Sequence, residues 1–85
     1  MSPGLTSPAS SSAPARAVLA ENLIRFRRER GWSQEALAFE AGLHRTFVAH
    51  VERCARNISL DNLERLAAAL EVAPFELLTP RLPAR

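Results

Sequence analysis

Apolar residues recur at helical spacing through the middle of the chain and at neither end. Residues 1–15 mix Ser, Pro, Ala and Gly without charge or periodicity. Such a segment buries too little apolar surface to offset its ordering entropy, so it predicts a disordered N-terminal arm. Residues 80–85 contain two prolines and predict a flexible tail. One domain is therefore expected at residues 16–79.

The first helix is expected to begin at Arg16, because Leu19, Leu23 and Phe26 then share one face. Gly31 predicts its end, since a left-handed residue at that place favours glycine. Trp32 follows, and we expect its ring to cover the junction between the first and second helices.

Two short helices separated by a glycine come next. The first of them is expected at residues 34–41, with Ser33 as its N-cap. The second should begin near His44 or Arg45 and end near Arg53. Gly42 lies between them, where a tight turn requires a positive φ. Ala38 is small enough for a close approach of the two helices.

In the second of these helices, Val48 and Val51 are three residues apart and would hold one face against the core. The other side then projects Arg45, Thr46, Phe47, Ala49 and His50. This layout, over residues 34–53, is that of a helix-turn-helix. A plain helical hairpin within a bundle is the alternative.

Two further helices complete the predicted domain. Ser59 suits the N-cap of a fourth helix, whose apolar stripe is Leu63, Leu66, Ala67 and Leu70. Pro74 suits the first position of a short fifth helix, PFELL. The pattern thus predicts a compact, all-α, five-helix domain.

The composition agrees with this fold. The 85 residues suffice for one small domain, 47% of them are hydrophobic, and there is no tyrosine. All 11 positive residues are arginines, and the net charge is +2. Arginine forks suit phosphate and guanine edges, but genomic base composition also explains the preference for arginine.

The sequence lacks the residues that several classes of function require. One cysteine, Cys54, and two histidines without CxxC or HExxH spacing predict no disulfide, no metal and no cofactor. No apolar run is long enough for a bilayer, and the N-terminus does not resemble a signal peptide, so we expect a cytoplasmic protein without a membrane partner. No catalytic constellation is visible, so an enzyme is not expected.

Four residues are candidates to read base edges. Arg45 could fork onto O6 and N7 of guanine, although a phosphate contact or a solvated charge is the alternative. Thr46 can bond either base type. Phe47 could pack on a thymine methyl or be a half-buried core aromatic. His50 could reach a base edge or phosphate, or be an ordinary surface histidine.

Five residues are candidates to contact phosphate. Ser33 and Gln34 begin a helix, where free N–H groups attract anions. Arg53, Arg56 and Asn57 follow the second helix of the helix-turn-helix. Contacts of this kind supply salt-dependent affinity without sequence preference. A solvated arginine face is the alternative.

Three segments of the chain resemble the Xre-type, lambda-repressor-like helix-turn-helix family. They are RRERGWSQEALAFEAGLHRTFVAHVER, then RNISLDNLERLAAALEV, then PFELL. Within that family, LHRTFVAHVER and RNISLDNLERLA are most similar to the small controller proteins of restriction–modification systems. The resemblance implies a five-helix fold and a homodimer that binds a palindromic operator. It places Gln34 at a phosphate and Arg45, Thr46 and His50 at base edges.

The resemblance also implies that Arg27 pairs with Glu52. If the pair is buried, breaking it from one side should cost about 3–5 kcal/mol. An exposed pair would contribute less than about 1 kcal/mol.

Three residues depart from the family pattern. Cys54 replaces a usual glycine; if that position has a positive φ, the cysteine strains it by roughly 1 kcal/mol or shifts the loop. His44 stands where a Ser, Thr or Asp cap is usual. Phe47 replaces a frequent tyrosine and so lacks its hydroxyl.

The leading functional hypothesis is a dimeric transcriptional regulator that blocks or recruits RNA polymerase and joins the nucleoid when bound to DNA. Phe75, Leu77 and Leu78 would form the two-fold interface, unless they only seal the monomer core. The alternative is an antitoxin-like protein that binds a toxin and its own promoter. That alternative is weakened because neither end of the chain has apolar anchors at helical spacing.

Overall fold

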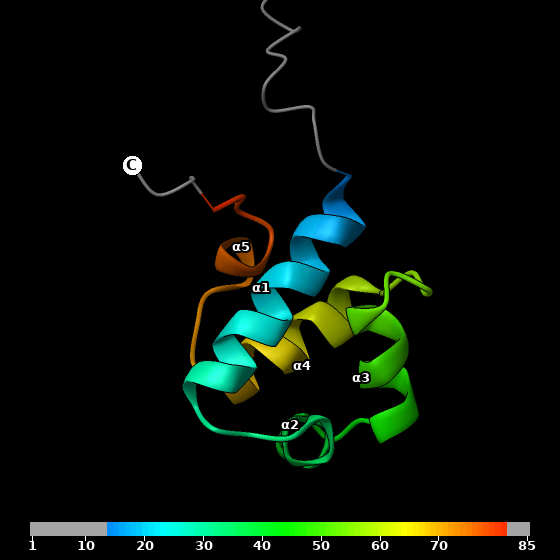
Figure 1. The fold of residues 1–85 in the computed structure, drawn as a ribbon, viewed down its shortest axis with the longest axis vertical. Coiled ribbons are helices and arrows are strands. Elements are labelled where there is room, and N and C mark those ends of the chain that lie inside the picture. Colours follow the sequence, from blue (N-terminus) through cyan, green and yellow to red (C-terminus); the bar gives the residue numbers. More distant parts are fainter. Residues whose placement is uncertain (1–13, 82–85) are drawn as a thin grey trace, which may run out of the picture.

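A computed structural model describes residues 14–81 of the chain. Within that range there are five helices and no strand, which confirms the predicted all-α class (Figure 1). The helices are α1 (Ala15–Glu29), α2 (Gln34–Ala41), α3 (Arg45–Glu52), α4 (Leu60–Leu70) and α5 (Pro74–Leu77). No helix in this range is both long and apolar enough to cross a bilayer.

The ends of the domain differ slightly from the prediction. Ala15, assigned to the disordered arm, is the first residue of α1, and Pro14 is its N-cap with φ −67°. The rigid ring of Pro14 and the helix propensity of alanine explain this earlier start. Residues 1–13 of the predicted arm and residues 82–85 of the predicted tail lie outside the described range.

Two serines cap helices as predicted. The Ser33 hydroxyl accepts the backbone N–H of Ala36 at 3.0 Å, and the Ser59 hydroxyl accepts that of Asn62 at 3.1 Å. Each bond satisfies one backbone donor that has no partner inside its own helix. The starts of α2 and α4 are therefore encoded locally.

The end of α4 was not predicted, because the sequence has no glycine there. Glu71 takes the left-handed conformation with φ 59° and ends the helix. The residue before it, Leu70, makes a contact with the end of α1: Arg30 Nη2 donates to the Leu70 carbonyl at 2.6 Å. The same Nη2 lies 3.3 Å from Glu71 Oε1. Arg30 thus satisfies a carbonyl at the C-terminal end of a helix distant in sequence.

The core lies where the apolar faces of the helices meet. α1 packs against α3 and α5, α2 against α3 and α4, and α4 also against α5 (Figure 1). Trp32, between α1 and α2, is half-buried and packs on this core. The fully buried side chains of the core include Leu23, Leu37, Val48, Leu66 and Leu77. Burial of such residues supplies the main favourable term in folding.

One buried polar residue, Asn22, connects α1 to the end of α5. Its side chain is only 2% exposed. Its Nδ2 donates to the carbonyls of Leu77 and Thr79, both at 3.0 Å, and lies 3.3 Å from that of Glu76. Its Oδ1 accepts from Arg25 at 3.0 Å. The sequence pattern did not indicate this role, because the acceptors are backbone atoms more than 50 positions away.

Candidate nucleic-acid interface

The turn between α2 and α3 is built around Gly42. Its φ is +70°, the left-handed conformation that favours glycine. The N–H of Leu43 donates to the carbonyl of Ala38 at 2.8 Å, which closes the end of α2. Ala38 itself is 2% exposed. These features orient α3 relative to α2.

The two sides of α3 differ in exposure. Val48 and Val51 are 0% and 2% exposed and anchor the helix in the core. Arg45 and Thr46 are exposed at the N-terminal end of α3. His44 precedes them as an N-cap without a side-chain hydrogen bond to the helix. The helix therefore presents one arginine and one hydroxyl, both suited to base edges, on a fixed support.

The other two base-reading candidates are less accessible. Phe47 is half-buried and packs against the core, and the Arg56 guanidinium lies 5.8 Å from its ring centroid. Phe47 thus has the packing of the partly buried aromatic that was its alternative. His50 is also half-buried.

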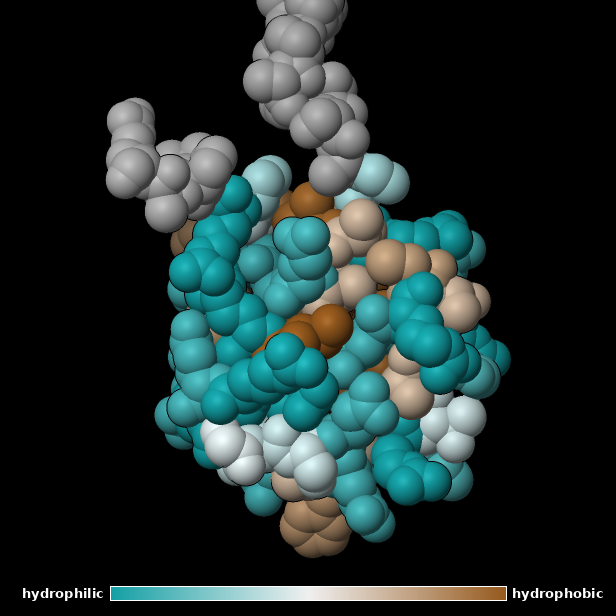
Figure 2. Space-filling view, in the orientation of Figure 1, coloured by the Kyte–Doolittle hydropathy of each residue, from teal (hydrophilic) through white to brown (hydrophobic). Residues whose placement is uncertain are grey.

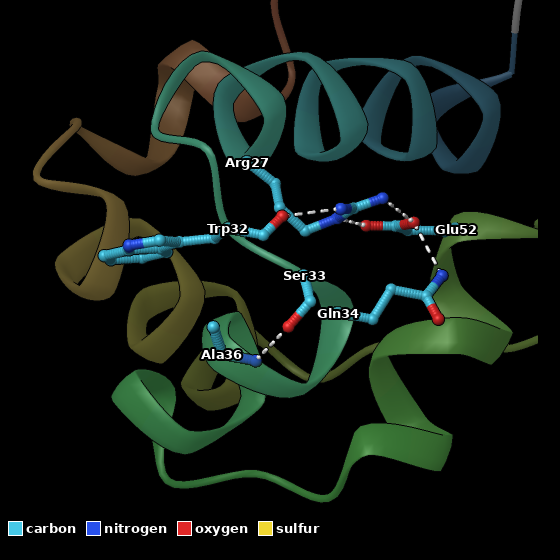
Figure 3. Close-up of polar contacts among 6 residues, drawn as sticks. All are labelled: Arg27, Trp32, Ser33, Gln34, Ala36 and Glu52. Atoms are coloured by element: carbon cyan, nitrogen blue, oxygen red, sulfur yellow. Dashed lines mark hydrogen bonds and ion pairs between the residues drawn. The ribbon is translucent and has the colours of Figure 1, made fainter.

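The start of α2 is occupied by internal hydrogen bonds. Gln34 Nε2 donates to Glu52 Oε1 at 2.8 Å, and the Ser33 hydroxyl caps Ala36 (Figure 3). Both side chains were expected to face phosphate, and both are engaged within the protein. One hydrogen of the Gln34 amide remains for a further acceptor.

Arg27 and Glu52 lie together between α1 and α3, as the resemblance implied (Figure 3). Arg27 Nε and Nη2 donate to the two carboxylate oxygens at 2.7 and 3.0 Å. Arg27 Nη1 also donates to the carbonyl of Trp32 at 2.8 Å. The side chains of Arg27 and Glu52 are 11% and 4% exposed, so the pair is largely buried. The network joins α1, α2 and α3.

Three phosphate candidates lie in the loop after α3. Arg53, Arg56 and Asn57 are all exposed. Asn57 Oδ1 accepts a hydrogen bond from Nη2 of Arg16 in the first turn of α1. Together these residues place three cationic or amide groups beside the C-terminal end of α3.

Cys54 follows Arg53, the C-cap of α3, and takes a left-handed conformation with φ 60°. The N–H of Ala55 donates to the carbonyl of His50 at 2.9 Å, a bond typical of helices that end this way. The Cys54 thiol donates to the carbonyl of Arg16 at 3.8 Å. The conformational strain expected at this position is therefore present.

A model of the helix-turn-helix family matches residues 23–77. The chain belongs to this family. The match spans the C-terminal part of α1, from residue 23, and all of the remaining helices, including the α2–α3 unit.

Relatives of the chain include a hypothetical transcription factor and a control protein. The chain is 57% identical over 65 residues to a hypothetical transcription factor of Neisseria meningitidis, covering 76% of this chain and 61% of the relative. It is 56% identical over 46 residues to the control protein C.BamHI of Bacillus amyloliquefaciens, covering 54% and 57%. The chain thus spans about three fifths of the length of these two curated relatives.

The fold is similar to that of a solved controller. The restriction–modification controller protein C.AhdI of Aeromonas hydrophila matches with a TM-score of 0.71 and 45% identity, over 73% of this chain and 94% of that one. These matches confirm the resemblance to controller proteins inferred from the motif. They also agree with the prediction that the chain is not an enzyme, and none of the three relatives is described as an antitoxin.

The predicted dimer surface needs one correction within this helix-turn-helix domain. Leu77 is 0% exposed and belongs to the monomer core, so it offers no surface to a second copy. The reason is that α5 turns Leu77 inward, toward α1 and α4. Phe75 and Leu78 remain available, at 69% and 41% exposed.

The surface is otherwise mostly polar. Figure 2 shows one face covered largely by hydrophilic side chains, with small, separate hydrophobic areas.

Within residues 14–81, no group of three His, Cys, Asp or Glu side chains is arranged to hold a metal ion. Arg16 was not among the predicted site residues, because its contact with Asn57 joins segments 41 positions apart.

Proposed function

We propose that this protein is a sequence-specific DNA-binding regulator of transcription, acting as a homodimer on a palindromic operator. We further propose that it is the controller of a restriction–modification system. The observation that carries the proposal is the orientation of α3. Val48 and Val51 bury one side, which leaves Arg45 and Thr46 exposed at the N-terminal end. That end of a recognition helix enters the major groove in helix-turn-helix proteins.

In this proposal Arg45 and Thr46 read base edges. A guanidinium can donate two parallel hydrogen bonds to O6 and N7 of guanine, which is worth about 1–3 kcal/mol of discrimination. Thr46 can donate to or accept from a base, or place its methyl against thymine. His50 is kept as a secondary base contact, because it is partly exposed further along α3.

Phosphate contacts would come from both ends of the unit. At the start of α2, Gln34 has one free amide hydrogen, and the N-terminal end of the eight-residue helix favours an anion. Ser33 would contribute through its backbone, since its hydroxyl already caps the helix. After α3, Arg53, Arg56 and Asn57 are exposed beside the proposed groove.

Dimerisation would use Phe75 and Leu78. Both are apolar and exposed, and they lie in α5 and directly after it. A two-fold interface of this kind would align two α3 helices with two half-sites about one turn of DNA apart. We also propose RNA polymerase as a partner. In this proposal the protein is cytoplasmic and joins the nucleoid when it is bound to its operator.

Selection of bound sequences from random duplexes tests the proposal. We expect a palindrome with half-sites about one helical turn apart. Arg45→Ala should then relax the preference at one base position in each half-site. Arg28→Ala is the matched control, because Arg28 is an exposed arginine of α1 and not part of the proposed recognition helix α3. Recovery of unrelated sequences, or an unchanged preference in Arg45→Ala, would contradict the proposal.

A further inference from the structure

The contact between Phe47 and Arg56 joins α3 to the loop that follows it. The Arg56 guanidinium carbon lies 5.8 Å from the centroid of the Phe47 ring. A cation within about 6 Å of a ring face is attracted by the negative potential of that face. The ring itself is half-buried and packs on the core, so it is a fixed support.

The residues on either side of Arg56 are also hydrogen-bonded to helices. On one side, the N–H of Ala55 donates to the carbonyl of His50 in α3 at 2.9 Å. On the other side, Asn57 Oδ1 accepts from Arg16 of α1. The loop is thus tied to two helices, and the main freedom left to Arg56 is that of its long side chain.

We propose that Phe47 is a positioning residue that acts on DNA through Arg56. Its ring holds the guanidinium beside α3 before DNA arrives, where Arg56 contacts a phosphate. An arginine that is already ordered loses less conformational entropy when it binds. The inference rests on the proposed DNA-binding function, and it assigns Phe47 a role other than contact with a thymine methyl.

The burial of Phe47 favours this role over direct base contact. One part of the ring packs on the core and another part faces Arg56, so less of the ring remains for a base. Phe39 of α2 offers a comparison, since it is 81% exposed. Within residues 14–81, no guanidinium lies over its ring. An exposed phenyl group therefore does not by itself order an arginine.

A double-mutant cycle on operator affinity tests the proposal. Phe47→Leu should weaken binding about two- to fivefold, as expected for an exposed cation–π contact. In an Arg56→Ala background it should weaken binding no further, and it should leave the preferred sequence unchanged. Equal weakening in both backgrounds, or a changed base preference, would overturn the proposal. So would an equal loss in the Phe39→Leu control.

A second measurement uses the free protein. The side-chain methylene protons of Arg56 should show a ring-current shift in NMR spectra that disappears in Phe47→Leu. If that variant does not fold, Phe47→Met keeps an apolar side chain without an aromatic ring and serves instead. An Arg56 signal unchanged by loss of the ring would overturn the proposal.

These outcomes separate the two claims. Failure of the wild-type protein to bind any duplex would refute the proposed function. A wild-type protein that binds its operator without coupling between Phe47 and Arg56 would refute this inference alone.

Discussion

Arg27 of α1 and Glu52 of α3 are joined by two hydrogen bonds, at 2.7 and 3.0 Å. The Glu52 carboxylate also accepts the amide of Gln34 at 2.8 Å. Since Gln34 is the first residue of α2 and Glu52 the last of α3, one carboxylate connects both helices of the proposed DNA-binding unit to α1. Loss of this carboxylate should therefore affect both the stability of the domain and the orientation of α3.

Glu52→Ala should lower the free energy of unfolding by about 3–5 kcal/mol, because it leaves the Arg27 charge buried without its partner. Replacing both residues by methionine should cost less than that, since no unpaired charge remains. Urea denaturation followed by circular dichroism measures the difference. Glu29→Ala is the control, because its pair with Arg25 is surface-exposed and should contribute under about 1 kcal/mol. Equal losses in Glu52→Ala and Glu29→Ala would contradict the prediction.

Asn22→Leu should lower the free energy of unfolding by about 1–3 kcal/mol. The substitution keeps a side chain of similar size and removes the donor shared by three carbonyls at the end of α5. Thermal unfolding measures the loss, with Glu21→Ala on the exposed side of the same helix as control. The control should stay within about 0.5 kcal/mol of the wild type. An unaffected melting temperature in Asn22→Leu would show that these hydrogen bonds contribute little.

Cys54→Gly should stabilise the protein by up to about 1 kcal/mol. The left-handed conformation at φ 60° costs a non-glycine residue about 1–2 kcal/mol, and glycine offsets part of that gain through its unfolded-state entropy. Cys54→Ala keeps the strain and removes the thiol contact with Arg16, so it should show no gain. Chemical denaturation compares the two variants. Stabilisation of both to the same extent would assign the effect to the thiol instead of the backbone.

Phe75→Glu should affect dimerisation, whereas Leu77→Ala should affect the stability of the monomer. Phe75 is exposed, so a charge there should weaken the proposed dimer and leave monomer stability nearly unchanged. Leu77 is fully buried, so truncation should cost about 2–5 kcal/mol of stability. Sedimentation equilibrium and urea denaturation measure the two effects. Leu60→Glu is the control, because Leu60 is 76% exposed at the start of α4. Loss of the dimer in this control as well would argue against a specific α5 interface.

The helices of this protein could be predicted because their signals are local. Ser33 and Ser59 mark helix starts, and Gly31 and Gly42 mark helix ends, each through interactions within a few residues. The spacing of Val48 and Val51 likewise indicated which side of α3 is buried, and so which side stays exposed. A Glu71 in the left-handed conformation carries no such signal, and the end of α4 was missed for that reason.

The sequence by itself determined the helix-turn-helix and its outward-facing Arg45, because periodicity and turn chemistry act over a few residues. Only the tertiary structure decided the side chains whose partners are distant. Gln34 bonds Glu52, Asn22 bonds α5, Leu77 enters the core, and Arg56 lies over Phe47. In each case the contact forms between elements, and its geometry depends on how the helices pack. The spacing of residues along the chain does not predict that packing.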